Sequence, residues 1–146
     1  MVPAPLSPYA GSKTNDDQKT NTMMNQNEAL FFLEDKLPEM KEDLARKSPK
    51  EGILPVFSSI QCLTDFMIRQ VKTHNRQMLK RGFSVADKLY QRGNGNVKNA
   101  IEVVFIHSFS ILFTTCATRL ERMQLQSLMP LHLYEVYVAQ ASRPNY

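Results

Sequence analysis

Apolar residues recur at steps of three and four from about residue 25 onward, a spacing that predicts amphipathic helices. The first apolar stripe consists of Leu30, Leu33, Leu37, Met40 and Leu44. Asn25 or Asn27 is placed to cap this helix. Pro38 interrupts it, because proline removes a backbone donor and disfavours a helical residue before it. We therefore expect a kink or break, followed by a short segment that ends near Lys47.

Two further helices are predicted between about Pro55 and Gln91. The helix from Pro55 to about His74 carries Phe57, Ile60, Leu63, Met67 and Val71 on one face. The helix from Asn75 to Gln91 has apolar residues on one side and cations on the other, so its basic side is expected to face solvent. Gly93 follows, and we expect it to end this helix in the left-handed conformation.

The segment from Val97 to about Thr115 is apolar around most of its circumference, which is typical of a helix in the middle of a bundle. Its β-branched residues leave a strand as an alternative, but nineteen residues without a turn signal favour a helix. Helix then continues to about Gln126, breaks before Pro130 and ends with a short helix from Leu131. The sequence thus predicts an all-α fold, either an antiparallel bundle or a short HEAT-like stack of five to six helices.

The chain divides into three parts by composition. Residues 1–24 contain Pro3, Pro5 and Pro8 and then a polar stretch, so they are predicted to be a disordered tail or an upstream extension. Residues 25–141 form the helical domain, and residues 142–146 are expected to fray. No secretory signal is visible, and the longest apolar run is shorter than the roughly 20 residues of a membrane span. We therefore expect a cytoplasmic protein without membrane association.

Candidate chemistry is sparse in this sequence. Cys62 and Cys116 lie in apolar stretches without metal-ligand spacing, so they are predicted to be reduced core thiols. His74, His107 and His132 show no metal-binding pattern and are expected to have structural roles, such as a hydrogen bond from His107 to a neighbouring helix. No nucleophile motif or phosphate-binding loop is recognisable. These observations favour a protein that is not an enzyme and that uses no catalytic residues, cofactor or metal.

Charge is unevenly distributed along the chain, whose formal net charge is +4. Residues 25–47 carry six acids against four bases, whereas residues 69–98 carry eight bases against Asp87 alone. The candidate partner-binding residues are Arg76, Lys80, Arg81, Lys88 and Arg92. This basic side is either an ordinary solvated face, a docking surface for an acidic protein, or a site for nucleic-acid phosphates. The last is the least favoured, because Phe83 and Tyr90 fall on the apolar side.

A sequence pattern in the middle of the chain adds a family resemblance. The pattern comprises Ala86-Asp87-Lys88-Leu89-Tyr90, Gly93-Asn94 and Val97-Lys98-Asn99-Ala100-Ile101. It resembles an uncharacterised family of small bacterial all-helical proteins, a domain of unknown function, over about residues 25–141. A weaker similarity links the turn-plus-helix to helical immunity proteins of bacterial toxin systems. A HEAT-type helix pair uses the same residues for packing, so the pattern also has a purely structural interpretation.

The leading hypothesis is a non-enzymatic, protein-binding module that covers an acidic surface of its partner, with an immunity-like role as one form. The alternative is a helical protein that associates with nucleic acid through the basic face of residues 69–98. The sequence leaves the partner and the oligomeric state open.

Overall fold

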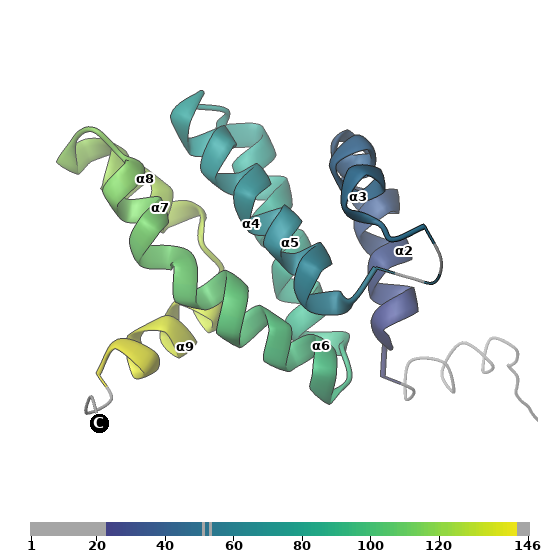
Figure 1. Ribbon diagram of the computed structural model, residues 1–146. Coiled ribbons are helices and arrows are strands. Elements are labelled where there is room, and N and C mark those ends of the chain that lie inside the picture. Colours follow the sequence, from purple (N-terminus) through teal and green to yellow (C-terminus); the bar gives the residue numbers. More distant parts are fainter. Residues whose placement is uncertain (1–22, 51, 53, 143–146) are drawn as a thin grey trace, which may run out of the picture.

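The predicted helical domain is all-α in the computed structural model, which describes residues 23–50, 52 and 54–142 (Figure 1). The helices are α2 (Gln26–Lys36), α3 (Lys41–Lys47), α4 (Val56–Lys72), α5 (Arg76–Arg92), α6 (Gly95–Ala100), α7 (Phe109–Thr115), α8 (Arg119–Leu128) and α9 (Leu131–Ala141). Helices α6 and α7 are parts of one continuous helix, which makes seven helices in the described residues. Most of the predicted tail and residues 143–146 lie outside the described residues.

The predicted count of five to six helices was low, because the chain breaks fully before Pro38 and breaks again between Thr115 and Arg119, where continuous helix was predicted. Leu37 leaves the helical conformation (φ −131°, ψ 70°), and Pro38 opens a short 3₁₀ turn that leads into α3. A capping box between Asn25 and Glu28 starts α2, so Asn25 and not Asn27 is the cap. Both sides of the break contribute to the core, since Leu33, Leu37, Met40 and Leu44 are buried.

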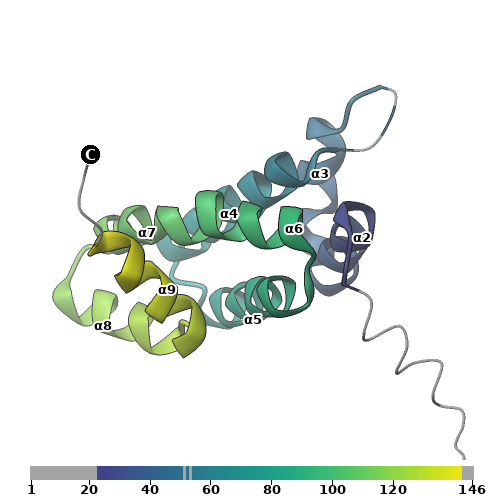
Figure 2. The same ribbon diagram turned by 90° about the horizontal axis from the view of Figure 1, so that it is seen from below.

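Helix α4 occupies the middle of the molecule, between α2 with α3 on one side and α7 with α8 on the other (Figures 1 and 2). It contacts α2, α3, α5, α6 and α7. The central position was predicted for the helix after Val97, but that helix has an outward face on which Val103 and Ile111 are exposed. Phe57, at the start of α4, is likewise exposed and not on the buried face as predicted.

Three fully buried phenylalanines join α5 to the continuous helix. Phe83 of α5 lies edge to face against Phe105 and Phe109, with ring centroids 6.1 Å away in each case. Phe105 and Phe109 are themselves 5.5 Å apart in the same edge-on arrangement. Such T-shaped pairs add attraction beyond the area they bury, so this cluster helps to fix how α5 packs against the continuous helix.

The tight turn between α4 and α5 is built on His74, not on a glycine. His74 has φ 58°, and the amides of His74 and Asn75 donate to the carbonyls of Val71 and Gln70, which is a Schellman motif. Gly93 was predicted to be left-handed but is extended (φ −74°, ψ 155°). It is required for a different reason: a Cβ there would lie 2.5 Å from the carbonyl oxygen of Leu89.

A π-helical turn, Ile101–Phe105, interrupts the continuous helix and anchors α9. Glu102 lies in this turn and accepts a 2.5 Å hydrogen bond from the Tyr90 hydroxyl of α5. The backbone carbonyl of Glu102 accepts a 3.1 Å bond from the Gln140 side chain of α9. Widened turns of this kind free a carbonyl for such a partner. The π-helical turn thus binds α9 through Gln140 and α5 through Tyr90.

The continuous helix Gly95–Thr115 has 21 residues, so by length and composition it meets the requirement for crossing a membrane, contrary to the expectation from the shorter apolar run. Its inner face, which includes Ile101, Phe105 and Phe109, is buried in the protein core. Its outer face mixes exposed apolar and polar residues, among them His107. A core helix of a folded domain has these same properties.

The first described residues are tied to the α5–α6 turn. The amide of Met24 donates to the carbonyl of Arg92, and the amide of Asn94 donates to the carbonyl of Met24. Met24 is the last residue of the predicted tail, yet it forms a β-bridge with Gly93. Met24 therefore belongs to the helical domain and not to the predicted tail.

Candidate protein-binding surface

The five predicted partner-binding residues all lie exposed on α5. The opposite side of the helix is buried, with Leu79, Gly82, Phe83, Val85, Ala86 and Leu89 in the core. This division confirms the predicted amphipathic character of the segment. The five cations nevertheless have different surroundings, because α2 and α8 contact the helix in different places.

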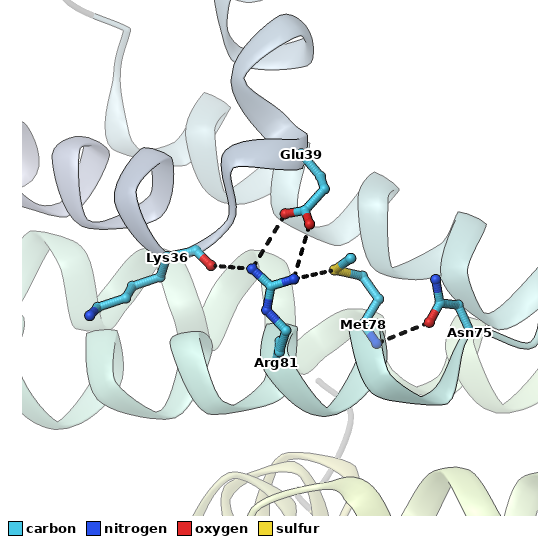
Figure 3. A network of polar contacts seen from close by, with 5 residues as sticks. All are labelled: Lys36, Glu39, Asn75, Met78 and Arg81. Atoms are coloured by element: carbon cyan, nitrogen blue, oxygen red, sulfur yellow. Dashed lines mark hydrogen bonds and ion pairs between the residues drawn. The ribbon is translucent and has the colours of Figure 1, made fainter.

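Arg81 is held by the protein's own chain (Figure 3). Its guanidinium donates to both carboxylate oxygens of Glu39, at 3.0 and 3.4 Å, and to the backbone carbonyl of Lys36 at 2.8 Å. Lys36 is the last residue of α2, so Arg81 satisfies a carbonyl that the helix end leaves unpaired. The hydrogen bond from Arg81 also lowers the pKa of Glu39 below its usual value. Arg81 is therefore a link between α5 and the first helices.

The acidic first helices neutralise a second base of the basic segment. Asp43 of α3 forms ion pairs with Arg46 and with Arg69 of α4. By contrast, Lys80, Lys88 and Arg92 form no ion pair with any residue in the described part of the chain. The excess of bases in residues 69–98 is thus partly used inside the fold and partly presented to solvent.

A hollow of about 160 Å³ lies between α2 and α5. It is lined by Phe32, Lys36, Arg81, Ser84, Val85 and Lys88. The lining contains three cations and no acid, and its apolar part comes from the half-buried Phe32 and from Val85. The ammonium of Lys36 lies 5.9 Å from the centroid of the Phe32 ring, within cation–π range. The hollow is a shallow basic groove with a small apolar floor.

Arg76 lies at the other end of α5, at a hollow of about 90 Å³ between the α4–α5 turn and α8. The ring of His74 lies 3.8 Å from a carboxylate oxygen of Glu121 here, a pair that is ionic only when the histidine is protonated. The rest of the lining is mostly apolar and includes Leu125 and Cys116. Arg76 therefore lies at a different hollow from the α2–α5 groove, whose first α5 residue is Arg81.

The remaining candidate groups have structural surroundings. Cys62 and Cys116 are buried and unpaired, as predicted, and burial raises the pKa of both thiols. His107 is exposed, and within the described residues its side chain forms none of the predicted hydrogen bonds to a neighbouring helix. His132 packs on Tyr90, with ring centroids 5.4 Å apart. No cluster of three or more histidine, cysteine or acidic side chains suited to a metal occurs among the residues that the structure describes.

Sequence reasoning missed a larger hollow, of about 380 Å³, formed by α7, α8 and α9. Arg119, Arg122 and Met123 line it from α8, and Tyr134 and Tyr137 line it from α9. A signal was present in the sequence, since these positions repeat at steps of three along two predicted helices. The sequence pattern predicts only a further helix in this segment and assigns no function to its surface.

Similarity to a known family covers most of the helical domain. Residues 32–143 match the family described as a domain of unknown function (DUF7674). No curated protein and no solved structure matches the chain. The matched residues span the described helices from within α2 to the end of α9.

Proposed function

The chain belongs to the family described as a domain of unknown function (DUF7674), and we propose that it is a non-enzymatic binding module for a protein with an acidic surface. The proposed docking surface, called here the α5 surface, consists of Lys36, Lys80, Lys88 and Arg92 around the α2–α5 groove. On binding, the α5 surface would cover the acidic face of the partner, as an immunity-like protein covers its target.

One observation carries this proposal: Lys80, Lys88 and Arg92 form no ion pair with any described residue, whereas Lys36 of the same surface is paired with Asp35. Glu39 and Asp43 are engaged by Arg81 and Arg69, so they do not screen Lys80, Lys88 and Arg92. Uncompensated charges around an apolar floor favour a partner of opposite charge, because they speed encounter and fix its orientation. The surface therefore suits an acidic protein face.

Nucleic acid fits this surface less well. The basic segment has eight cations in sequence, but Arg69 and Arg81 are already paired with acids of the chain. Phe83 is buried and Tyr90 is directed into a hydrogen bond with Glu102, so neither ring is offered among the cations for stacking on a base. We therefore retain the protein partner as the proposal and use nucleic acid as an outcome of the test.

Charge reversal tests the proposal. The full chain carrying Lys80→Glu, Lys88→Glu and Arg92→Glu is compared with the unaltered chain in co-purification from an extract, followed by mass spectrometry. A matched control carries Lys41→Glu, Lys47→Glu and Lys50→Glu, which reverse the same charge at exposed positions on and after α3. We expect an acidic protein to be retained by the unaltered chain and the control and lost by the α5 variant.

The captured protein is then purified and titrated against all three chains. The proposal predicts at least about a ten-fold weaker affinity for the α5 variant, with a difference that shrinks as salt screens the charges. Equal affinity for the α5 variant and the control contradicts it. Loss of the interaction on nuclease treatment also contradicts it and supports the nucleic-acid alternative. Unchanged helical circular dichroism establishes that the variants are folded.

A further inference from the structure

A second surface lies at the opposite end of the molecule from α2, where α8 and α9 meet the end of α7 (Figures 1 and 2). The hollow there is named the C-terminal groove and is lined chiefly by Phe113, Arg119, Arg122, Met123, Tyr134 and Tyr137. At about 380 Å³ it is larger than the α2–α5 groove of about 160 Å³. The residues that line the C-terminal groove take no part in the proposed function of the α5 surface.

The floor of the C-terminal groove is aromatic and is supported by the core. The ring of Tyr137 lies 6.0 Å from Phe113 and 6.0 Å from Tyr134, measured between ring centroids. It also lies 5.4 Å from Phe109, which belongs to the buried phenylalanine cluster. Phe113, Tyr134 and Tyr137 are only half-buried, so each presents part of a firmly placed ring to the outside. The floor is therefore formed before any ligand arrives.

The wall provided by α8 combines exposed apolar and basic residues. Only Leu125 of this helix is buried, whereas Leu120 and Met123 are 64% and 59% exposed. Arg119 and Arg122 are exposed and take part in no ion pair with any described residue. No acidic residue contributes to the lining of the groove. The wall thus has two unbalanced positive charges beside apolar surface that the fold leaves uncovered.

From this combination we propose that the C-terminal groove docks an acidic peptide segment of a partner protein, with an aromatic or aliphatic side chain seated on the ring floor. The acidic residues of the peptide pair with Arg119 and Arg122, and Met123 packs on the anchor. Arginine beside aromatic and methionine side chains is the composition that protein interfaces favour at their centres. This inference does not depend on the α5 surface.

Two other ligand classes fit the groove less well. A small molecule needs a site that encloses most of its surface, whereas this hollow is shallow and flanked by exposed side chains. A single-stranded nucleic acid needs cations along its whole path. The α9 side of the groove offers none, and Glu135 of α9 is exposed with a negative charge. A peptide needs cations only on the α8 side, which is where they are.

Peptide selection tests this proposal directly. A library of random 12-residue peptides is selected against the full-length chain, and enriched peptides are synthesised. The chain has no tryptophan, so a tryptophan placed at the apolar anchor of a peptide reports its burial by a blue shift without background. We expect the enriched peptides to share acidic residues next to an aromatic or aliphatic residue. We also expect at least a ten-fold loss of affinity in Arg119→Glu/Arg122→Glu.

Two variants distinguish the C-terminal groove from the α5 surface. Glutamate is favourable in the first turn of a helix, so Arg119→Glu/Arg122→Glu is expected to fold, which circular dichroism checks. Lys80→Glu/Lys88→Glu/Arg92→Glu is expected to bind the same peptides within two-fold. The proposal is overturned if no acidic peptide is enriched, if both variants weaken binding equally, or if a 12-residue thymidine oligonucleotide displaces the peptides.

Discussion

Arginines at the two ends of this molecule have opposite roles. At the α2 end, Arg81 bonds to Glu39 and to the carbonyl of Lys36, so its charge is used to join two helices. At the α8–α9 end, Arg119 and Arg122 stand beside exposed apolar residues without an acidic partner among the described residues. The difference shows that an exposed basic residue indicates a binding surface only where no acidic residue of the same fold pairs with it.

The largest expected effect concerns the support of the C-terminal groove. Phe109→Ala removes the ring that joins the buried phenylalanine cluster to Tyr137 of the groove floor. We expect the free energy of unfolding to fall by about 3–5 kcal/mol, the usual loss when a buried phenylalanine is replaced by alanine. Phe113→Ala, at a half-buried position, should cost less than half as much. The free energy of unfolding is measured by urea denaturation. Equal losses for the two variants would show that the core does not support the groove floor through Phe109.

Two polar contacts of α5 should respond to opposite extremes of pH. Burial and the hydrogen bond to Glu102 raise the pKa of Tyr90 to about 12, so this contact stabilises the fold below about pH 10 and is lost as the pH rises towards 12. The hydrogen bond from Arg81 lowers the pKa of Glu39, so that contact is present above about pH 4.5 and is lost as the pH falls through the lowered value.

Tyr90→Phe and Glu39→Gln separate these contributions. At neutral pH we expect Tyr90→Phe to lower the free energy of unfolding by about 2 kcal/mol, because it leaves the half-buried Glu102 carboxylate without its hydrogen-bond donor. Between pH 10 and 12 the unaltered chain should lose its advantage over the variant. Glu39→Gln should instead flatten the stability curve on the acid side. An advantage of the unaltered chain over Tyr90→Phe that persists at pH 12 would show that the tyrosine is not held in its neutral form.

The smallest expected effect compares the arginines themselves. Arg81→Ala should lower the free energy of unfolding by about 1 kcal/mol, since the lost ion pair is solvent-exposed and only the bond to the Lys36 carbonyl adds to it. Arg122→Ala should change it by less than about 0.5 kcal/mol, as for surface positions without partners. Similar losses for both substitutions, measured by urea denaturation, would remove the distinction between them.

The helices could be predicted closely from the sequence, because apolar spacing, Pro38, Pro55 and Pro130 mark their faces and starts. The turn geometry could not. Glycine is the usual left-handed residue, yet His74 takes this conformation between α4 and α5, where the short connection imposes it. Gly93 is needed instead because the Leu89 carbonyl comes too close for a side chain, which is a contact between turns that a pattern cannot reveal.

The candidate surface was predicted only in part. The five cations of α5 are exposed, as the amphipathic pattern indicates. That Arg81 belongs to the fold depends on Glu39, 42 residues earlier, and this pairing exists only once α2 packs on α5. The C-terminal groove likewise joins side chains of three helices, and only the packed structure brings Arg122 beside Tyr137.

Chemical modification of arginines in the native full-length chain tests most directly whether the basic charge is divided between folding and binding. Phenylglyoxal reacts with accessible, unpaired guanidinium groups, and mass spectrometry of the digested chain gives a rate for each arginine. We predict that Arg92, Arg119 and Arg122 react several times faster than Arg69 and Arg81. Modification of Arg81 as fast as that of Arg119 would contradict the division.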